Sequence, residues 1–510
     1  MTNDATHTDD EETRNGRTTA TDGGVAAAAS ARDTDAQVSA AESAALRLAN
    51  VDEETRNAAL RSIAAAIRDH EAAILDANAR DVAAAEELLK AGEYTAALVD
   101  RLKLDGTKIE SIASMVESVA EQTDPLGKTL AARELDEALE LYRVAVPIGV
   151  VATVFESRPD ALVQIAALSL KSGNAVILKG GSEASKSNRI LHEIIRQATG
   201  GEAVASDASN DAGKSATDPT DAVDVDPTDA VDVDPTDAVE LPTGWAQLIE
   251  AHEAVDRLLE LDEQVDLVMP RGSSEFVSYI QDNTQIPVLG HTEGVCHVYV
   301  DRDADISMAA DVALDAKVQY PAVCNAVETL LVDEAVADEF LPTVVARYED
   351  AGVELRGDER TREIVDVDPA TDDDWRTEYG DLELSIAVVD DVYAAIEHIN
   401  ANGSKHTESI LTEDVETAET FMTGVDAASV FHNASTRFAD GYRYGLGAEV
   451  GISTGKIHAR GPVGLAGLTT YKYYLEGDGQ LVATYAGDDA KPFTHREFDG
   501  EWTPGRLSNR

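Results

Sequence analysis

Apolar residues recur at three- and four-residue spacing from about residue 36 to residue 121, and this spacing predicts a run of helices. The stretch AALRSIAAAIRDH (58–70) is a clear example. Residues 137–146 then alternate between apolar and polar side chains, which predicts strands. Residues 1–35 are rich in Thr, Asp, Gly and Ala without any periodicity, so we expect a disordered acidic tail there.

From residue 144 the pattern changes to short apolar runs separated by helical segments. VAVPIGVVATVF (144–155) predicts one buried strand that ends near Glu156, and NAVILKGG (174–181) predicts another. Helices are expected over 161–173 and over 182–198, the second with Ser182 as its cap. Nearly continuous apolar strands alternating with helices are typical of a parallel α/β sheet.

Residues 200–240 interrupt this alternation with three acidic octads. They are DPTDAVDV (218–225), DPTDAVDV (226–233) and DPTDAVEL (234–241). An acidic repeat with Pro is unsuited to a packed core, so we expect a disordered surface insertion. A calcium-binding repeat is the alternative, although the octads lack the glycine that such a loop needs.

The α/β pattern resumes at Trp245. WAQLIE (245–250), VDLVMPRGSS (265–274), IPVLG (286–290) and CHVYVD (296–301) predict strands, and a second α/β unit follows from about 305 to 424. Residues 425–475 are rich in Gly, Arg and Tyr. A chain of 510 residues is long enough for about two or three domains.

The net charge of the chain limits the kinds of molecule that the protein can bind. Asp and Glu number 97 against 41 Lys and Arg, for a net charge of −56, which excludes nucleic-acid binding. Self-repulsion at this charge destabilises a fold at low salt, whereas at molar salt the screening length falls to about 3 Å. We therefore expect a protein from a high-salt organism; an acidic protein of an ordinary organism is the alternative.

Two features of the chain predict a cytoplasmic location without a membrane partner. Cys296 and Cys324 are the two cysteines, too few for a disulfide framework and suited to a reducing compartment. The N-terminal residues lack the positive start and apolar run of a signal peptide, and 144–155 is too short to span a bilayer.

Three segments at expected strand ends are candidates for ligand binding. VPIGVVATVFESRPD (146–160) breaks into polar residues and Pro where ligands bind in open α/β folds, although an ordinary strand-to-helix turn has the same pattern. In NAVILKGGSEASKSN (174–188), Lys179 and two glycines precede a helix start, which suits phosphate or ribose. MPRGSSEF (269–276) has one glycine before a helix, and no GxGxxG occurs in the chain.

The segment YPAVCNAVETLLV (320–332) contains the candidate nucleophile, Cys324. It lies between an expected turn and an apolar run that is helix- or strand-like, and a thiolate at a helix N-terminus has a lowered pKa. The alternative is a buried structural cysteine, and the residues alone leave both open. Cys296, inside an apolar strand, is expected to pack in the core.

Collinear segments across residues 38–480 resemble the gamma-glutamyl phosphate reductases, also called glutamate-5-semialdehyde dehydrogenases, of the aldehyde dehydrogenase superfamily. The matching stretches are IGVVATVFESRPD, ALSLKSGNAVILKGG, VDLVMPRGSSEFV, GVCHVYVD, YPAVCNAVETLLV, NASTRFADG (433–441) and GAEVGISTGKIHARGPVGLAGLTTYKY (447–473). The superfamily's nucleotide-binding fold lacks GxGxxG, which agrees with its absence here.

This resemblance implies an α/β fold with two open parallel α/β domains and a small β oligomerisation arm. It places the nucleotide-binding domain at 36–130 and 144–288, the catalytic domain at 289–460, and the arm at 131–143 with 461–485. Residues 486–510 would be a C-terminal tail. The arm and the stretch TTYKYYLEGDGQ (469–480) imply a homo-oligomer.

The implied reaction is NADPH-dependent reduction of L-glutamate 5-phosphate to L-glutamate 5-semialdehyde, with release of phosphate, in proline biosynthesis. Cys324 would form a thioacyl intermediate, with its own backbone N–H and the side chain of Asn325 as oxyanion donors. NADP would bind along Lys179, Gly180, Ser182, Gly272 and Ser273. The preference for NADP over NAD rests on the resemblance, and no metal is implied.

The implied substrate has two charged ends. Ser157, Arg158, His291 and Arg437 are candidates for its anionic groups, and Asn433 and Ser435 for its amino-acid end. Ser157 stands where related enzymes place an asparagine, and the alternative for each arginine is a surface ion pair. Glu293 is the nearest match to the base of oxidising aldehyde dehydrogenases, which a reductase does not need.

Two rival interpretations remain at the level of sequence. One is an aldehyde-oxidising enzyme of the same superfamily. The other is an inactive scaffold or filament protein, against which the joint presence of Cys324, Lys179 and Gly272 argues. A glutamate 5-kinase that channels the labile acyl phosphate is a partner that the sequence leaves open.

Overall fold

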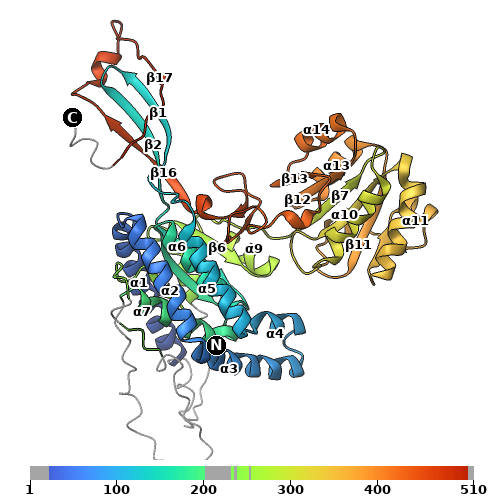
Figure 1. Ribbon diagram of the computed structural model, residues 1–510, viewed down its shortest axis with the longest axis horizontal. Coiled ribbons are helices and arrows are strands. Elements are labelled where there is room, and N and C mark those ends of the chain that lie inside the picture. The colour runs from blue at the N-terminus through green and yellow to red at the C-terminus, as the bar shows by residue number, and fades with distance from the viewer. Residues whose placement is uncertain (1–21, 201–230, 235–237, 252–253, 504–510) are drawn as a thin grey trace, which may run out of the picture.

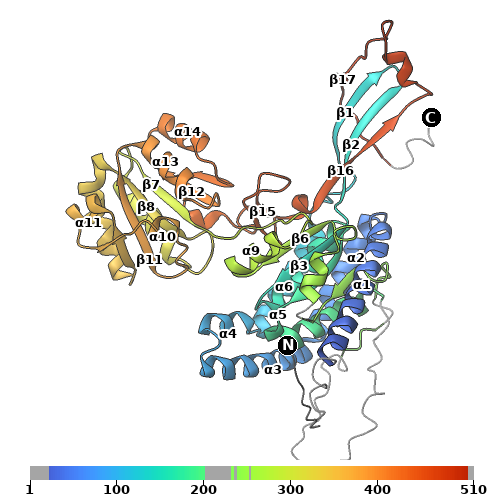
Figure 2. The same ribbon diagram turned by 180° about the vertical axis from the view of Figure 1, so that it is seen from behind.

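The computed structural model describes residues 22–200, 231–234, 238–251 and 254–503. They form two α/β domains and a β arm that projects away from both (Figures 1 and 2). No helix in these ranges combines the length and the apolar character needed to cross a membrane.

The first domain is built on a parallel sheet of four strands in the order β5-β4-β3-β6. Its strands are β3 (Val150–Phe155), β4 (Ala175–Gly180), β5 (Ala246–Leu248) and β6 (Leu267–Arg271). Every residue of β3 and β4 is buried, as their continuous apolar runs predict. The helices are α1 (Asp22–Leu48), α2 (Glu53–Asp69), α3 (Glu71–Ala91), α4 (Ala96–Leu102), α5 (Gly106–Glu121), α6 (Pro159–Lys171), α7 (Ser185–Ala198), α8 (Ala254–Leu259) and α9 (Ser274–Asp282), with the 3₁₀ helix η1 (Ser182–Ala184).

The helices cover the two faces of this sheet with separate cores. Apolar residues of α2, α5, α6 and α7 pack in one cluster, and residues of α1 and α8 pack in the other. Helix α1 corrects the expected boundary of the N-terminal tail, because it begins at Asp22, buries Thr34 and pairs Asp35 with Arg257. The rest of that predicted tail, residues 1–21, lies outside the described residues.

Part of the octad insertion packs on the first domain, which corrects the expected disorder there. Val231 and Leu241 are buried in the core cluster of α2, α5, α6 and α7, and Val233 and Val239 pack against it. Alternate residues of an extended chain point to the same side, so the described parts of the second and third octads place Val231 with Val233 and Val239 with Leu241 on the domain, while Asp232 and Glu240 are exposed. The first octad, 218–225, lies outside the described residues.

The second domain contains a parallel sheet of seven strands in the order β10-β9-β11-β8-β7-β12-β13. Its strands are β7 (Cys296–Val300), β8 (Val327–Asp333), β9 (Glu354–Gly357), β10 (Asp368–Pro369), β11 (Glu383–Val389), β12 (Thr407–Leu411) and β13 (Ser429–His432). Its helices are α10 (Ile306–Val318), α11 (Glu334–Asp350), α12 (Glu359–Ile364), α13 (Val392–Asn402) and α14 (Val415–Gly424), with η3 (Asp374–Arg376) and η4 (Thr436–Phe438). The expected strand at 286–290 is a single bridge between Val268 and Val288.

The arm is an antiparallel sheet in the order β16-β2-β1-β17. It consists of β1 (Thr129–Asp136), β2 (Leu139–Pro147), β16 (Thr469–Glu476) and β17 (Arg496–Glu497), with η6 (Val482–Tyr485) beside it. The apolar run 144–155 is therefore two strands of two sheets, divided by the turn at Gly149, whose φ is +137°. The predicted tail 486–510 also belongs to the arm as far as Trp502, which stacks on Tyr474 at 4.1 Å between ring centroids.

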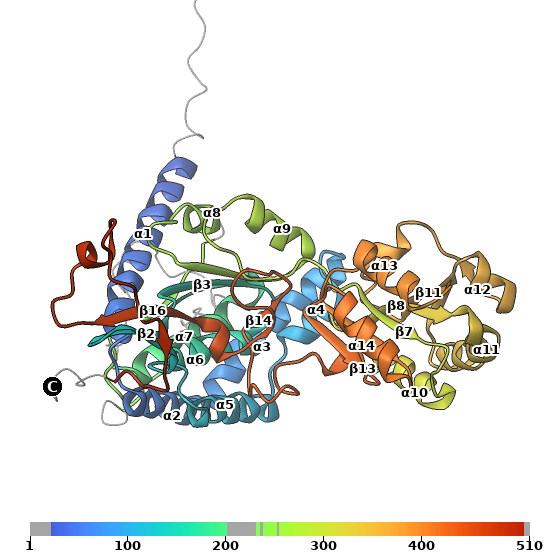
Figure 3. The same cartoon turned by 90° about the horizontal axis from the view of Figure 1, so that it is seen from above.

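The chain returns from the second domain to the first before residue 460, where the catalytic domain was expected to end. Ala448, Val450, Val463 and Leu468 lie in the first domain's core. This segment holds β14 (Gly451–Ser453), β15 (Gly461–Val463) and η5 (Leu465–Leu468). Figure 3 shows β14 between the strands of the first domain and the second domain. Residues 449–452, at the start of β14, line the cavity described below.

Candidate active site

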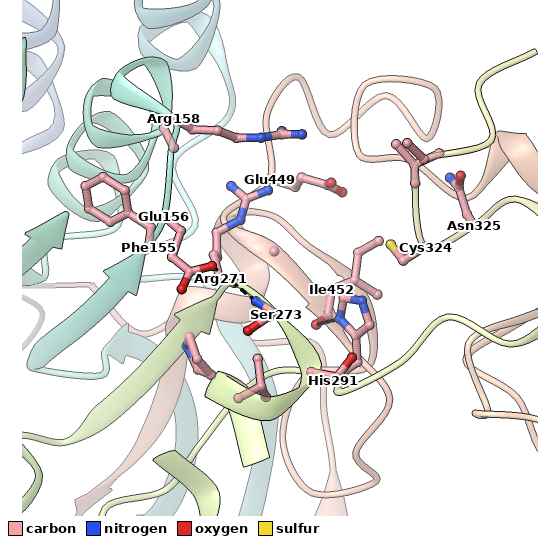
Figure 4. Close-up of a pocket in the computed structure, with 18 of the residues that line it drawn as sticks. Phe155, Glu156, Arg158, Arg271, Ser273, His291, Cys324, Asn325, Glu449 and Ile452 are labelled. Atoms are coloured by element: carbon pink, nitrogen blue, oxygen red, sulfur yellow. Dashed lines mark hydrogen bonds between the residues drawn. The ribbon is translucent and has the colours of Figure 1, made fainter. Parts of the chain in front are cut away.

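A cavity of about 830 Å³ lies where the strand ends of the first domain face the second domain. Its walls come from the ends of β3 and β6, the loop before β8, and residues 437–452, where the chain passes from the second domain back to the first (Figure 4). Neighbouring parallel strands end at the same edge of a sheet, which is why residues 155–158 and 269–274 meet here.

The ends of β3 and β6 are tied together by Glu156. Its backbone N–H donates to the Arg271 carbonyl at 3.0 Å, and its carboxylate accepts from the Ser273 N–H at 3.2 Å. A Cβ at Gly272 would lie 2.7 Å from that carboxylate, so a larger residue in this turn before α9 would displace Glu156 from its present position. Gly272 and Ser273 both line the cavity.

Cys324 lies in a turn between α10 and β8 and is partly exposed to the cavity. Two contacts fix its backbone: the Cys296 thiol donates to the Cys324 carbonyl at 3.2 Å, and a Cβ at Gly294 would lie 2.0 Å from the same oxygen. A strand follows Cys324, so the helix N-terminus considered from the sequence is not there to stabilise a thiolate.

The surroundings of Cys324 favour the neutral thiol. Burial raises its pKa to about 12, the carboxylates of Glu378 and Glu449 add to this, and the Arg271 guanidinium acts against it. The expectation of a lowered pKa is therefore wrong for this structure, and a proton has to leave the thiol before it can attack.

Arg158 and Arg271 are two of the four cavity arginines that lack a carboxylate partner among the described residues; Arg101 and Arg437 are the others. Among the described residues no carboxylate lies within ion-pair distance of Arg158 or Arg271, although the chain holds 97 acidic residues. Both side chains extend into the cavity in Figure 4, with Glu449 opposite them. Burial and the nearby Arg158 lower the pKa of Arg271, as expected for cations held together away from water. This arrangement suits an anionic ligand.

Other residues predicted for catalysis or substrate binding also line the cavity: Ser157, His291, Asn325 and Arg437. Asn325 donates one N–H to the Ala439 carbonyl at 2.8 Å, so at most one N–H remains for an oxyanion. Ser157, with φ +51°, donates both its N–H and its hydroxyl to Glu183, at 2.6 and 3.0 Å. Its hydroxyl proton is therefore engaged within the protein. Arg437 is buried, and its Nε donates to Gln319 at 3.0 Å.

Asn433 and Ser435 do not line the cavity, and their assignment to the amino-acid end of the substrate stays a prediction. Asn433 has φ +54° and bonds the N–H and carbonyl of Thr412 through its amide, each at 2.9 Å. The Ser435 hydroxyl caps η4 by accepting the Arg437 N–H at 3.3 Å. Both residues shape the turn that delivers Arg437.

Lys179, Gly180 and Ser182 lie at the end of β4 and do not line this cavity. Lys179 is buried, its Nζ donates to the Gly180 carbonyl at 2.6 Å, and no described carboxylate pairs with it. Burial lowers its pKa. A buried cation without an ion pair fits the phosphate or ribose end of a nucleotide.

The start of α7 differs from the sequence prediction. Ser182 begins η1 and is exposed, whereas Ala184 precedes the helix without a side-chain cap. Asp81 from α3 accepts the N–H groups of Lys186 and Ser187 instead, at 3.3 and 2.8 Å. That helix terminus is thus already occupied by a carboxylate, which leaves Lys179 as the candidate for anion binding.

Sequence reasoning missed Arg271, Glu378 and Glu449. Arg271 stands in the quoted segment MPRGSSEF, where a charge at the end of an apolar strand was the available signal. Glu378 accepts the Gly294 N–H at 2.9 Å and Glu449 the Gly441 N–H at 2.8 Å; nothing in their local sequence marks them. Glu293, the residue weighed as a hydrolytic base, is exposed and outside the cavity wall.

Known proteins resemble this chain over most of its length. The aldehyde dehydrogenase family profile matches residues 5–206 and 233–378. Gamma-glutamyl phosphate reductases from Natronomonas pharaonis and Haloquadratum walsbyi are 66% and 64% identical over 473 and 474 residues, covering 92% and 91% of this chain and 99% and 95% of theirs.

A crystal structure of gamma-glutamyl phosphate reductase from Thermotoga maritima superposes with a TM-score of 0.76 at 38% identity, over 88% of this chain and 99% of that one. The coverage and the sequence identity of these matches together establish the family of this chain. The chain belongs to the aldehyde dehydrogenase family, in the group of gamma-glutamyl phosphate reductases.

Proposed function

We propose that this enzyme reduces L-glutamate 5-phosphate to L-glutamate 5-semialdehyde with NADPH, releasing phosphate, in proline biosynthesis. One observation carries the proposal: the partly exposed thiol of Cys324 shares a cavity with Arg158 and Arg271, which have no carboxylate partner among the described residues. A nucleophile beside an anion site is what attack on an acyl phosphate needs. The names of the relatives support this substrate.

In this mechanism the Cys324 thiolate attacks the acyl carbon, a C–S bond forms, and the bond to the phosphate oxygen breaks. Arg158 and Arg271 hold the departing phosphate. The thiol proton leaves beforehand to the solvent, and the nearby Arg271 guanidinium favours the thiolate that remains. Arg437, buried at the cavity wall, pairs with the substrate carboxylate.

The oxyanion of the attack is stabilised by the Cys324 backbone N–H and the remaining N–H of Asn325. The aldehyde dehydrogenase family uses a nicotinamide cofactor. When bound, NADPH supplies the hydride that the thioacyl carbon accepts. Lys179 would hold the anionic end of the cofactor, and Gly272 and Ser273 would support the end nearer the thiol.

The experiment that tests the proposal follows cofactor reduction with glutamate 5-semialdehyde in molar KCl, with and without phosphate. We expect a rate with phosphate and none without it, and a higher kcat/KM with NADP than with NAD. A rate that does not depend on phosphate would identify an aldehyde-oxidising enzyme and contradict the proposal.

We further infer a cytoplasmic homo-oligomer that associates through the arm. β16 is an edge strand, and Tyr471, Tyr473 and Leu475 on it are each at least half exposed. An exposed apolar edge strand is a ready surface for another chain. Sedimentation in molar KCl is expected to give a mass above that of one chain. A glutamate 5-kinase partner stays a prediction from the sequence.

A further inference from the structure

Cys324 lies beside two histidines from other parts of the chain. His291 precedes β7, His406 directly precedes β12, and Cys324 precedes β8. Each residue offers one ligand atom, and the three atoms lie within 4.8 Å of one another. One sulfur and two imidazole nitrogens are a donor set that zinc and similar soft divalent cations favour.

The hydrogen bonds of the two rings leave a nitrogen of each for a ligand. His291 Nδ1 lies 3.1 Å from the Ile452 carbonyl, which can only accept, so Nδ1 carries the proton and Nε2 has the lone pair. This contact to a backbone carbonyl is the way that metal-binding histidines are usually oriented.

His406 supplies an independent indication of a ligand. Its side chain is 1% exposed, Nδ1 lies 2.9 Å from the Thr407 hydroxyl, and Nε2 is buried with no hydrogen-bond partner in the described part of the chain. Buried polar atoms are nearly always hydrogen-bonded, so this nitrogen without a partner, in a ring that lies beside the Cys324 thiol, calls for a ligand.

Backbone packing fixes the spacing of the group. Gly294 abuts the Cys324 carbonyl, as the lack of room for a Cβ shows, and it lies three positions after His291. Cys296, in β7, donates to the same carbonyl at 3.2 Å, and its sulfur lies 3.7 Å from His406 Nδ1. Cys324 and His291 also line the cavity, through which an ion can enter and which leaves a fourth position open.

We propose that Zn²⁺, or another thiophilic divalent cation, binds Cys324, His291 and His406 and thereby inhibits the enzyme. On binding, the S–H bond breaks, its proton passes to the solvent and an S–Zn bond forms, with no change of oxidation state. A chelator reverses the step. Inhibition rests on the proposed role of Cys324 as nucleophile, whereas binding does not.

The test titrates the chelator-treated full-length protein in molar KCl with Co²⁺, which reports its ligands by absorption. We expect one equivalent to give a thiolate-to-cobalt charge-transfer band that Zn²⁺ removes. Cys324→Ser abolishes the band, Cys296→Ser keeps it, and His406→Ala or His291→Ala weakens binding by at least about tenfold. His432→Ala, at an exposed histidine of β13, serves as the matched control and leaves binding unchanged.

No charge-transfer band in the wild-type protein, or a band that survives Cys324→Ser, would overturn the proposal. Surface carboxylates that bind Co²⁺ give no such band, so the charge of the chain does not confuse the result. The phosphate-dependent rate is measured in parallel, with Zn²⁺ and then with a chelator. A normal band with no phosphate-dependent rate would contradict the proposed reaction and leave the metal site standing.

Discussion

Cys324 lies between charges of both signs, and their balance sets its reactivity. Burial and the carboxylates of Glu378 and Glu449 raise its pKa to about 12, while Arg271 opposes them. Near neutral pH the thiol is protonated, and the thiolate fraction rises about tenfold for each pH unit below the pKa. This protects a nucleophile that faces solvent from oxidation and alkylation.

Glu378→Gln is expected to make Cys324 more reactive. A carboxylate that raises the thiol pKa lowers the thiolate fraction, so its removal raises the alkylation rate at a fixed pH. Glutamine still has an oxygen to accept the Gly294 N–H. The measurement is the rate of iodoacetamide labelling of Cys324 between pH 7 and 9, in molar KCl with EDTA. Glu293→Gln, at an exposed position, should leave the rate unchanged, and an unchanged or slower rate in Glu378→Gln would contradict this account.

At the scale of elements, the loop that carries Cys324 is held at both ends by a buried ion pair. Lys317 near the end of α10 and Glu328 in β8 are almost fully buried, with 2.6 Å between Nζ and Oε2. Burial raises the pKa of Glu328 to about 7 even so. Because this exceeds the unfolded value, ionisation of Glu328 weakens the fold as the pH rises from about 4.5 through 7.

Lys317→Met is expected to lower the free energy of unfolding by about 3–5 kcal/mol at pH 8, because it leaves a buried carboxylate unpaired. At pH 6 the loss should be smaller, since Glu328 can then take up a proton. Denaturant unfolding of the variant and of the wild-type protein, in molar KCl at both pH values, measures this loss of free energy of unfolding. Lys317→Met combined with Glu328→Gln is the control and should lose less; an equal loss at the two pH values would refute the argument.

The parts of the fold that the sequence predicts are those fixed by local pattern. The continuous apolar runs of β3 and β4 predict fully buried parallel strands, and the structure confirms them. The division of 144–155 between two sheets escapes prediction, because both halves are equally apolar. The packing of Val231, Val233 and Val239 escapes prediction for a related reason: it depends on a neighbouring core that local composition does not reveal.

Among the residues that line the cavity, the sequence predicts a role for Cys324 and Arg158 but not for Glu449. Arg158 follows a strand end, a position at which ligands are expected. For Cys324, the family resemblance favours the role of nucleophile over that of a structural cysteine. Glu449 enters the cavity only because the chain returns to the first domain after the second is complete. Asn433 and Ser435 stand in a matching segment, yet their side chains turn to backbone groups of their own domain.

At the scale of the whole molecule, the charge of −56 is the dominant feature. Many surface ion pairs, such as that between Arg347 and Asp311, involve the 41 basic residues, so most of the 97 acids have no cation to pair with. The relatives from Natronomonas pharaonis and Haloquadratum walsbyi come from halophilic archaea, which agrees with a protein adapted to high salt.

The unfolding temperature is therefore expected to rise steeply with KCl and to level off at molar concentrations, where the screening length is about 3 Å. Differential scanning calorimetry across a KCl series measures it. Sucrose of equal osmolality is the control, because it is excluded from the protein surface and stabilises a fold without screening charge. If sucrose raises the unfolding temperature as much as KCl does, screening of charge repulsion does not explain the effect of the salt.

The central claim is that Cys324 carries the glutamyl group, and mass spectrometry of the acylated enzyme tests it most directly. The protein is mixed with glutamate 5-semialdehyde and NADP without phosphate, quenched with acid and digested. We predict one glutamyl thioester per active chain on the peptide that contains Cys324, absent in Cys324→Ser and lost when phosphate is added before the quench. Cofactor reduction without any adduct on Cys324, or an adduct on another residue, would contradict the mechanism.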